Sequence, residues 1–466
     1  MTTKETEKQI EKGSASRTVA PAVAPAIAPA VAPQKVLSKL ALALGLPLAV
    51  ASTLCLAAIG LEAVFALAGL GDEEYVRPDP VYGIAHYERK YVTFKSEGFS
   101  RGWFSSKGLR DSEHPLVKPA NTTRIAFLGD SKTEGLQVPQ EETFVKRLEA
   151  KLNAQAEKAG RAKHFETINF ATAGYGTLAE YLQYINQVKE YKPDVTVLVY
   201  NFGDSGESGE SGAVNNTLAR PSAKLDKDGK LEISFDALDK WLVSDATSFK
   251  EATEWLRRQS RVFQVFTAED LAMRSDNKFY TKFSDSVVKP VCNFLGKHWR
   301  KNHGQSPETC KAIAENRRAL LATTRTLDGQ ISHEAVLPPA PRAPLALSAE
   351  SQSFQAFAAE YRNNMELTAR LLKLLNAACK ANGSKLVLVT LPAPDNCTFY
   401  FWELRTIKML GDQCGFQVVD ANETFPKLKA MEANPYYYSS HLSPIGHERM
   451  TEIMVKGGVA NSLENK

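Results

Sequence analysis

Short apolar runs alternate with longer amphipathic segments in two separate parts of the chain. Each run is short enough for a buried strand, and each longer segment repeats its apolar residues every three to four positions, as a helix does. The strand-like runs cover 124–128, 165–170, 195–200, 385–391 and 416–420, and the helical patterns cover 140–153, 178–190, 354–382, 401–410 and a segment after Pro444. This order predicts an α/β fold, in which helices cover both faces of a doubly wound parallel sheet in three layers.

The alternation stops between about residues 205 and 353. Within this stretch, the residues around Asp228-Gly229 predict a hairpin, and those around Trp255 and Phe263 are partly helical in pattern. The proline-rich segment 337–344 reads as a rigid linker. We interpret 205–353 as a large insertion, or a cap over the strand ends.

The first 70 residues have a different character from the rest. Residues 1–34 are polar and then place a proline at every fourth position, so we expect a disordered, extended Ala/Pro-rich tail. Residues 40–61 carry no charge and are long enough to cross a bilayer as a helix. The alternative is a cleaved signal peptide, because Ala66-Leu67-Ala68 has the spacing of a processing site.

Charges flanking the apolar segment predict its orientation. Lys35 and Lys39 precede it, and Asp72 and two glutamates follow it. The positive-inside rule then places the N-terminus in the cytoplasm and residues 72–466 on the far side of the membrane, as a single-pass protein.

Composition and cysteine usage narrow the function classes. The 466 residues are 43% hydrophobic and carry a net charge of only +4, which suits globular domains and gives no reason to expect nucleic-acid binding. Outside the apolar segment, Cys292 with Cys310 and Cys397 with Cys414 are possible disulfides, and free thiols are the alternative. No cysteine or histidine cluster has zinc spacing, so we expect neither a metal nor another cofactor.

Two residues far apart in the chain are candidates for nucleophilic catalysis. Ser131 follows the apolar run 124–128 directly, where a parallel sheet collects its reactive groups, and His441 stands near the C-terminus. A serine hydroxyl is a poor nucleophile unless a base removes its proton. The alternatives are that Ser131 caps the following helix and that His441 is a surface histidine.

Four segments in order resemble the four motif blocks of the SGNH or GDSL hydrolase family. They are 129–131 (Gly-Asp-Ser), the segment ending at Gly174, 201–204 (Asn-Phe-Gly-Asp), and the segment around His441. The segment 107–111 (Lys-Gly-Leu-Arg-Asp) and the N-terminal apolar helix look like a membrane-anchored bacterial branch of that family. The resemblance covers about 105–204 and 354–457, and it implies a flavodoxin-like sheet.

This resemblance implies a serine hydrolase with Ser131 as nucleophile and His441 as base. The oxyanion would be held by the amides of Ser131 and Gly174 and by a side chain of the third block. The family usually ends that block Gly-x-Asn-Asp, whereas here Gly203 precedes the aspartate and the asparagine is Asn201. Asn201 and Gly203 are therefore both candidates for the remaining oxyanion contact.

The acid of the triad also departs from the family pattern. An aspartate usually stands two or three residues before the histidine, and those positions are Tyr438 and Ser439 here. A histidine oriented by a backbone carbonyl, as a dyad, is one alternative. Carboxylates that could supply the acid, or support the site in another way, are Asp130, Asp204, Asp395 and Asp420.

The resulting expectation is a membrane-anchored serine ester hydrolase that acts through an acyl-serine intermediate, with O-acyl groups of envelope polysaccharide or glycolipid as possible substrates. A catalytically inactive SGNH-like binding or assembly module of the cell envelope is the competing hypothesis, because both departures fall on catalytic positions. A nucleotide-binding protein would need a glycine-rich phosphate loop, and the sequence has none.

Overall fold

The computed structural model divides the chain into two units, Met1–Leu61 and Glu62–Lys466. Helix α1 (Pro33–Leu67) contains the predicted span 40–61, and its segment Pro47–Phe65 is long and apolar enough to cross a membrane, with a mean hydropathy of 2.1. The structure describes residues 33–67, 75–95, 97–202, 204–209, 214–215, 218–242, 255–256, 260–263, 290, 294, 307–334, 337–339, 352–392, 398–425, 435–438 and 440–459. The predicted tail lies almost entirely outside these residues.

Five parallel strands form the sheet at the centre of the second unit, in the spatial order β13-β12-β7-β5-β6. If the five strands are numbered 1 to 5 in the order of the chain and read from the β6 edge, the spatial order is 2-1-3-4-5. This is the flavodoxin-like arrangement. The predicted fold class is therefore confirmed. The strands are β5 (Thr122–Leu128), β6 (His164–Asn169), β7 (Val195–Tyr200), β12 (Lys385–Thr390) and β13 (Gln417–Asp420).

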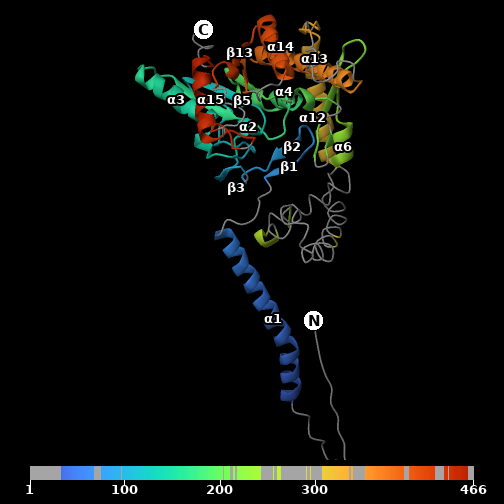
Figure 1. The fold of residues 1–466 in the computed structure, drawn as a ribbon. Helices are drawn as coiled ribbons and strands as arrows, with labels where there is room; N and C mark the ends of the chain where they lie inside the picture. Colours follow the sequence, from blue (N-terminus) through green and yellow to red (C-terminus); the bar gives the residue numbers. More distant parts are fainter. Residues whose placement is uncertain are drawn as a thin grey trace, which may run out of the picture. The chain divides into compact units, whose positions relative to one another are not determined.

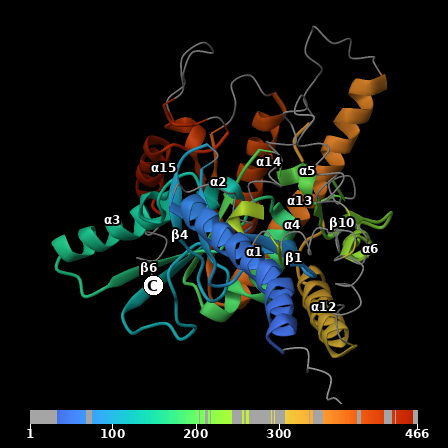
Figure 2. The same ribbon diagram turned by 90° about the horizontal axis from the view of Figure 1, so that it is seen from below.

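Helices cover both faces of this sheet (Figures 1 and 2). Successive side chains of a strand point to opposite faces, so Ile125 and Phe127 of β5 join one core and Ala126 and Leu128 join the other. The first core includes α3 (Phe144–Lys158) and α15 (Pro444–Lys456), and the second includes α4 (Thr177–Asn186), α13 (Gln352–Ala381) and α14 (Thr398–Cys414). Burial on both faces explains why central strands such as β7 are almost entirely apolar.

The described part of the expected insertion contains more regular structure than the sequence suggested. The predicted hairpin is present as β10 (Ser222–Leu225) and β11 (Leu231–Ser234). The 22-residue helix α12 (Pro307–Asp328) was not predicted, and it joins the core shared by α4 and α13. Shorter elements here are α5 (Asp204–Glu207), β8 (Val214–Asn215), β9 (Leu218–Ala219) and α6 (Asp236–Leu242).

Two N-terminal hairpins precede the sheet, and the sequence analysis did not predict them. They pair β1 (Val76–Asp79) with β2 (Gly83–His86) and β3 (Tyr91–Phe94) with β4 (Ser100–Trp103). The buried Arg110 guanidinium donates to the carbonyl oxygens of Glu134 and Val138, at 2.9 and 2.5 Å, and to Ser100 Oγ on β4 at 3.3 Å. Arg110 therefore fastens the second hairpin to the end of the helix Ser131–Glu134 and to the loop that follows it.

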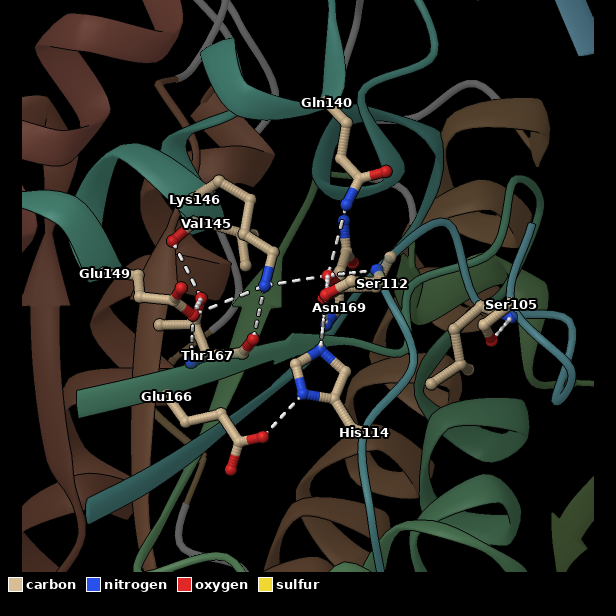
Figure 3. A network of polar contacts seen from close by, with 12 residues as sticks. Ser105, Ser112, His114, Gln140, Val145, Lys146, Glu149, Glu166, Thr167 and Asn169 are labelled. Carbon is tan, nitrogen blue, oxygen red and sulfur yellow. Dashed lines mark hydrogen bonds and ion pairs between the residues drawn. The ribbon is translucent and has the colours of Figure 1, made fainter. Parts of the chain in front are cut away.

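The neighbouring Asp111 fastens the same segment to the sheet, and its partners Lys146, His114 and Asn169 are labelled in Figure 3. Its carboxylate lies 2.7 Å from Lys146 Nζ and 3.3 Å from His114 Nε2, and it accepts the Asn169 amide at 2.8 Å. His114 Nδ1 in turn lies 2.6 Å from Glu166 on β6. The segment 107–111, which the sequence analysis noted for its resemblance, therefore links the second hairpin to α3 and β6.

Thiols are free at Cys55, Cys379 and Cys414, so the disulfide considered between 397 and 414 is not formed in this structure. Cys292 and Cys397 lie outside the described residues.

The contacts of His114 with Asp111 and Glu166 lead us to expect that the stability of the fold depends on pH. Burial opposes the charged form of His114, but hydrogen bonds with Asp111 and Glu166 outweigh this effect and raise the pKa of His114 to about 9. Because the pKa of His114 is higher in the folded state, its protonated ring contributes fully to stability below the unfolded-state pKa of about 6.5. This contribution is lost as the pH rises through about 9. His114→Gln should lower stability by about 1–3 kcal/mol near pH 6 and remove this part of the alkaline decline.

Thermal unfolding of the full chain across this pH range measures the effect. The exposed His164 provides the matched control, and His164→Gln should leave the curve unchanged. An unaltered decline in the His114 variant would contradict the assignment.

Candidate active site

Ser131 lies at the carboxyl end of β5, next to the point where the strand order of the sheet reverses. It begins the short helix α2 (Ser131–Glu134), and the Asp130 side chain caps this helix by accepting the Lys132 amide at 2.9 Å. Gly129 makes the tight exit possible, because a Cβ there would lie 2.4 Å from Thr133 Oγ1. Crevices at such switch points are where flavodoxin-like sheets bind their ligands.

His441 reaches the same edge from the other end of the chain. The Ser443 hydroxyl caps α15 by accepting the Gly446 amide at 3.2 Å, and the Tyr438 amide donates to the His441 carbonyl at 2.9 Å, so the loop before the helix is fixed on both sides. The His441 Nε2 atom lies 2.9 Å from Ser131 Oγ. The structure therefore brings the two candidate residues within hydrogen-bonding distance, 310 positions apart in sequence.

Glu97, which the sequence analysis did not consider, is the carboxylate that contacts His441. Its Oε2 atom lies 2.7 Å from His441 Nδ1 and accepts the His441 amide at 3.2 Å, and its Oε1 atom accepts the Ser440 hydroxyl at 2.9 Å. Partial burial opposes the charged form, but the hydrogen bonds with His441 and Ser440 outweigh it and lower the pKa of Glu97. An ionised carboxylate at Nδ1 selects the tautomer in which Nε2 can accept the serine proton.

Glu97 lies in the loop between β3 and β4, and the next residue explains how the loop approaches. A Cβ on Gly98 would lie 2.3 Å from the Gln137 carbonyl oxygen and 2.9 Å from the Tyr438 ring, so only glycine allows this contact. A Glu-Gly pair between two β-like runs was the sole local signal in the sequence. It did not identify a partner 344 positions away.

Gly174 occupies a tight turn beside Ser131. The Tyr175 amide donates to the Thr172 carbonyl at 3.1 Å, and Gly174 has a φ of +78°, which a type II turn requires at its third position. The Thr172 amide donates to the Gly129 carbonyl at 3.1 Å, and the Ala173 amide donates to Glu134 Oε2 at 2.8 Å. These contacts hold the turn against the segment that carries the serine.

Asn201 follows β7 and is held by two charged side chains from the serine segment. Its Nδ2 donates to Asp130 Oδ2 at 2.9 Å, and its Oδ1 accepts from Lys132 Nζ at 2.7 Å. The two contacts fix which end of the amide is oxygen and which is nitrogen. One N–H of the amide is then left for a further acceptor.

Three buried carboxyl groups lie behind this amide. Asp204 Oδ2 accepts the backbone N–H of Asn201 at 2.8 Å. Burial, followed by the charges of Glu180 and Asp130, raises the pKa of Asp204 well above its usual value. Burial, and then Asp130 and Glu207, likewise raise the pKa of Glu180, and burial raises the pKa of Asp130 against the opposing effect of Lys132. Asp130 and Asp204 thus support Asn201 rather than orient His441 through a hydrogen bond.

The other candidates lie elsewhere. Asp420 caps a short helical turn and lies 2.7 Å from Lys408, away from the His441 ring, and Asp395 and Gly203 are outside the described residues. His447 is buried, accepts the Phe144 amide at 3.1 Å, and has a pKa lowered to about 3 by burial and by Arg110. Within the described parts of the chain, His, Cys, Asp and Glu side chains form no group of three that could hold a metal ion.

Comparison with known proteins yields only distant likenesses. No family model matches the chain, and no curated protein matches it. Solved structures similar to it include a GDSL-like lipase from Bacteroides thetaiotaomicron VPI-5482, at 10% identity over 73% of this chain and 89% of that chain, with a TM-score of 0.31. An acetyl xylan esterase is similar at 11% identity over 72% of this chain and 99% of that chain, with a TM-score of 0.31. A lipase from a goat rumen metagenome is similar at 14% identity over 72% of this chain and 98% of that chain, with a TM-score of 0.28.

The first of these proteins is named for the family that the four sequence blocks resemble.

Substitution of Glu97 tests its role as the orienting acid. Glu97→Gln removes the charge that holds His441 and stabilises its protonated form, so kcat for ester hydrolysis should fall by about 10²–10⁴ with little change in KM. Steady-state kinetics with p-nitrophenyl acetate measures this. Glu113→Gln, at an exposed carboxylate of the same N-terminal segment, is the control, and equal activity in both variants would contradict the assignment.

Substitution of Lys132 tests how Asn201 is positioned. Lys132→Met removes the donor to Asn201 Oδ1, so the side-chain amide of Asn201 can rotate and its free N–H is no longer held in one direction. If this N–H stabilises the oxyanion, kcat should fall by about 10–100-fold at nearly constant KM. Lys132→Arg retains a donor and should recover part of the rate. Lys151→Met, at an exposed lysine of α3, should have no effect. Full activity of Lys132→Met would show that the lysine contact is dispensable.

Proposed function

We propose that the chain is a serine ester hydrolase in which Ser131, His441 and Glu97 act as nucleophile, base and orienting acid. The observation that supports this is the continuous chain of contacts, 2.9 Å from Ser131 Oγ to His441 Nε2 and 2.7 Å from His441 Nδ1 to Glu97. Such an arrangement is recognised by geometry and roles, not by the order of the residues in the sequence.

The reaction takes two steps. Ser131 Oγ attacks the ester carbonyl carbon while His441 Nε2 takes the hydroxyl proton, and the tetrahedral intermediate then expels the alcohol, which receives that proton. The acyl group is left on Ser131. Water, deprotonated by His441, attacks this acyl-serine, and the carboxylic acid leaves as Ser131 recovers its proton.

Stabilisation of the oxyanion is assigned to three donors. Ser131 is the first residue of α2, and a helix leaves its first amides without internal partners. The Gly174 amide and the remaining N–H of Asn201 complete the set. A single preorganised donor of this kind is worth about 2.7–4 kcal/mol in the transition state.

The substrate and location proposed follow from the sequence. Helix α1 supports an anchor in the bacterial inner membrane, with the N-terminus cytoplasmic and the catalytic unit on the periplasmic side. O-acyl groups on envelope polysaccharide or glycolipid are then the esters within reach. The inactive-module alternative was motivated by two missing catalytic groups, for which we propose Glu97 and Asn201 as replacements.

Active-site labelling tests the proposal directly. A fluorophosphonate probe should label the full-length protein, and Ser131→Ala should abolish both labelling and p-nitrophenyl acetate hydrolysis, a loss of at least about 10³-fold. The variant should unfold at the temperature of the wild type. A wild-type protein that neither reacts with the probe nor turns over the ester would favour the inactive module.

A further inference from the structure

Three large aromatic side chains are exposed on and beside the hairpin that carries Glu97. Phe99 and Trp103 are 57% and 64% exposed, and Tyr438, whose ring lies against Gly98, is 45% exposed. A single exposed apolar residue is ordinary, but several large rings on one small element indicate an interaction surface. The proposed chemistry uses none of these three rings.

Phe99 and Trp103 lie on the outward face of the β3–β4 hairpin. Side chains alternate between the two faces of a strand, and Arg101 is exposed on the same face as these two rings, whereas Phe104 is buried. Tyr91 of β3 pairs with Trp103, and the two rings meet edge to face with centroids 5.2 Å apart. The hairpin therefore presents an aromatic outer face with a guanidinium group between the two exposed rings.

The chain that leaves α1 joins the second unit beside this face. Tyr75 stacks on Phe104 with ring centroids 6.1 Å apart, and Phe104 directly follows Trp103. The apolar segment of α1 ends at Phe65, ten positions before Tyr75. Because a residue spans at most about 3.6 Å, Tyr75 lies within about 36 Å of the end of that segment. If α1 spans the membrane, the hairpin is kept close to the bilayer.

Net charge does not explain an attraction between this region and a membrane. Residues 72–107 contain six basic and six acidic residues. The rings have a preference of their own, because tryptophan and tyrosine favour the interfacial layer, where one part of the side chain is apolar and the other is wet. Arg101 can extend from the same face to the headgroup phosphates, which neutral phospholipids also carry.

We propose that the outward face of the β3–β4 hairpin binds the phospholipid headgroup layer of the membrane that α1 spans. The proposal rests on the anchor proposed for α1, and it adds a second membrane contact, made by the catalytic unit itself. Exposed rings can also bind sugars, but the short connection to α1 favours lipid. Since Glu97 lies in the loop of this hairpin, a bound membrane supports that loop from outside.

Fluorescence quenching by brominated phospholipid tests this contact. The full chain is placed in lipid nanodiscs at one copy per disc, so that no second copy can cover the face. Discs with lipids brominated near the headgroup are compared with unbrominated discs, and the emission of Trp103 is the difference between wild type and Trp103→Tyr. We expect bromination to remove most of this emission, equally at low and high salt, because the contact depends on the rings and not on net charge.

Trp402 provides the matched control. It is 6% exposed, and its Nε1 donates to the Pro338 carbonyl at 3.0 Å. The emission lost in Trp402→Phe should be insensitive to bromination. Trp103→Tyr replaces an exposed ring, so its unfolding temperature should equal that of the wild type, and Ser131→Ala should give wild-type quenching because the contact does not depend on hydrolysis.

Unquenched Trp103 emission, or quenching that disappears at high salt, would overturn the proposal. Extraction of membranes at alkaline pH tests the anchor separately. A chain that stays in the membrane but shows no Trp103 quenching contradicts only the hairpin contact, whereas a chain released by alkali contradicts the anchor on which the contact rests. Ester hydrolysis measured on the same discs reports on the esterase independently of both.

Discussion

The parallel pairing of β5 with β7 is the constraint on which the rest of the site depends. Their connections leave in opposite directions, so the carboxyl ends of these two strands border a crevice that neither connection fills. Ser131 follows one strand and Asn201 follows the other. Asp130 and Lys132 then close the distance by binding the two ends of the Asn201 amide. Ser131 and Asn201 are therefore placed by the sheet itself, through strands that are buried on both faces and cannot shift independently.

Glu97 is positioned in a different way, because it lies on the β3–β4 hairpin outside the sheet. Glu97 lies on a hairpin that packs few apolar residues of its own, and such a hairpin is marginal in isolation. Arg110 compensates for this by joining β4 to the loop after α2, and Asp111 anchors the following segment to α3 and β6. The buried charges of Arg110 and Asp111 thus hold in place the hairpin that carries Glu97, whose carboxylate contacts His441.

The sequence predicted what depends on local pattern and missed what depends on long-range contact. Burial on both faces makes strands such as 195–200 almost entirely apolar, so the sheet was recognisable from the sequence. Ser131 was recognisable because a serine directly after such a strand must lie at the carboxyl edge of the sheet. Glu97 was not, because its loop is defined by the close approach of Gly98 to Gln137 and Tyr438, and no sequence spacing encodes that approach. The amphipathic helix α12 was missed for another reason, because its pattern lies in a stretch without flanking strands to frame it.

The buried carboxyl groups behind Asn201 determine the electrostatics of the site. Three ionised carboxylates close to a developing oxyanion would oppose it strongly in a medium of low dielectric constant. Burial, followed by the charges of neighbouring carboxyl groups, raises the pKa of Asp204 and of Glu180 and so opposes their ionisation, and burial also raises the pKa of Asp130 against the opposing charge of Lys132. The site can then use carboxyl groups as acceptors that fix Asn201 without accumulating the negative charge that several ionised acids would bring. Among the residues that the structure describes, Glu97 is the carboxylate hydrogen-bonded to His441, at the ring nitrogen opposite the one that faces Ser131, where a negative charge stabilises the protonated ring.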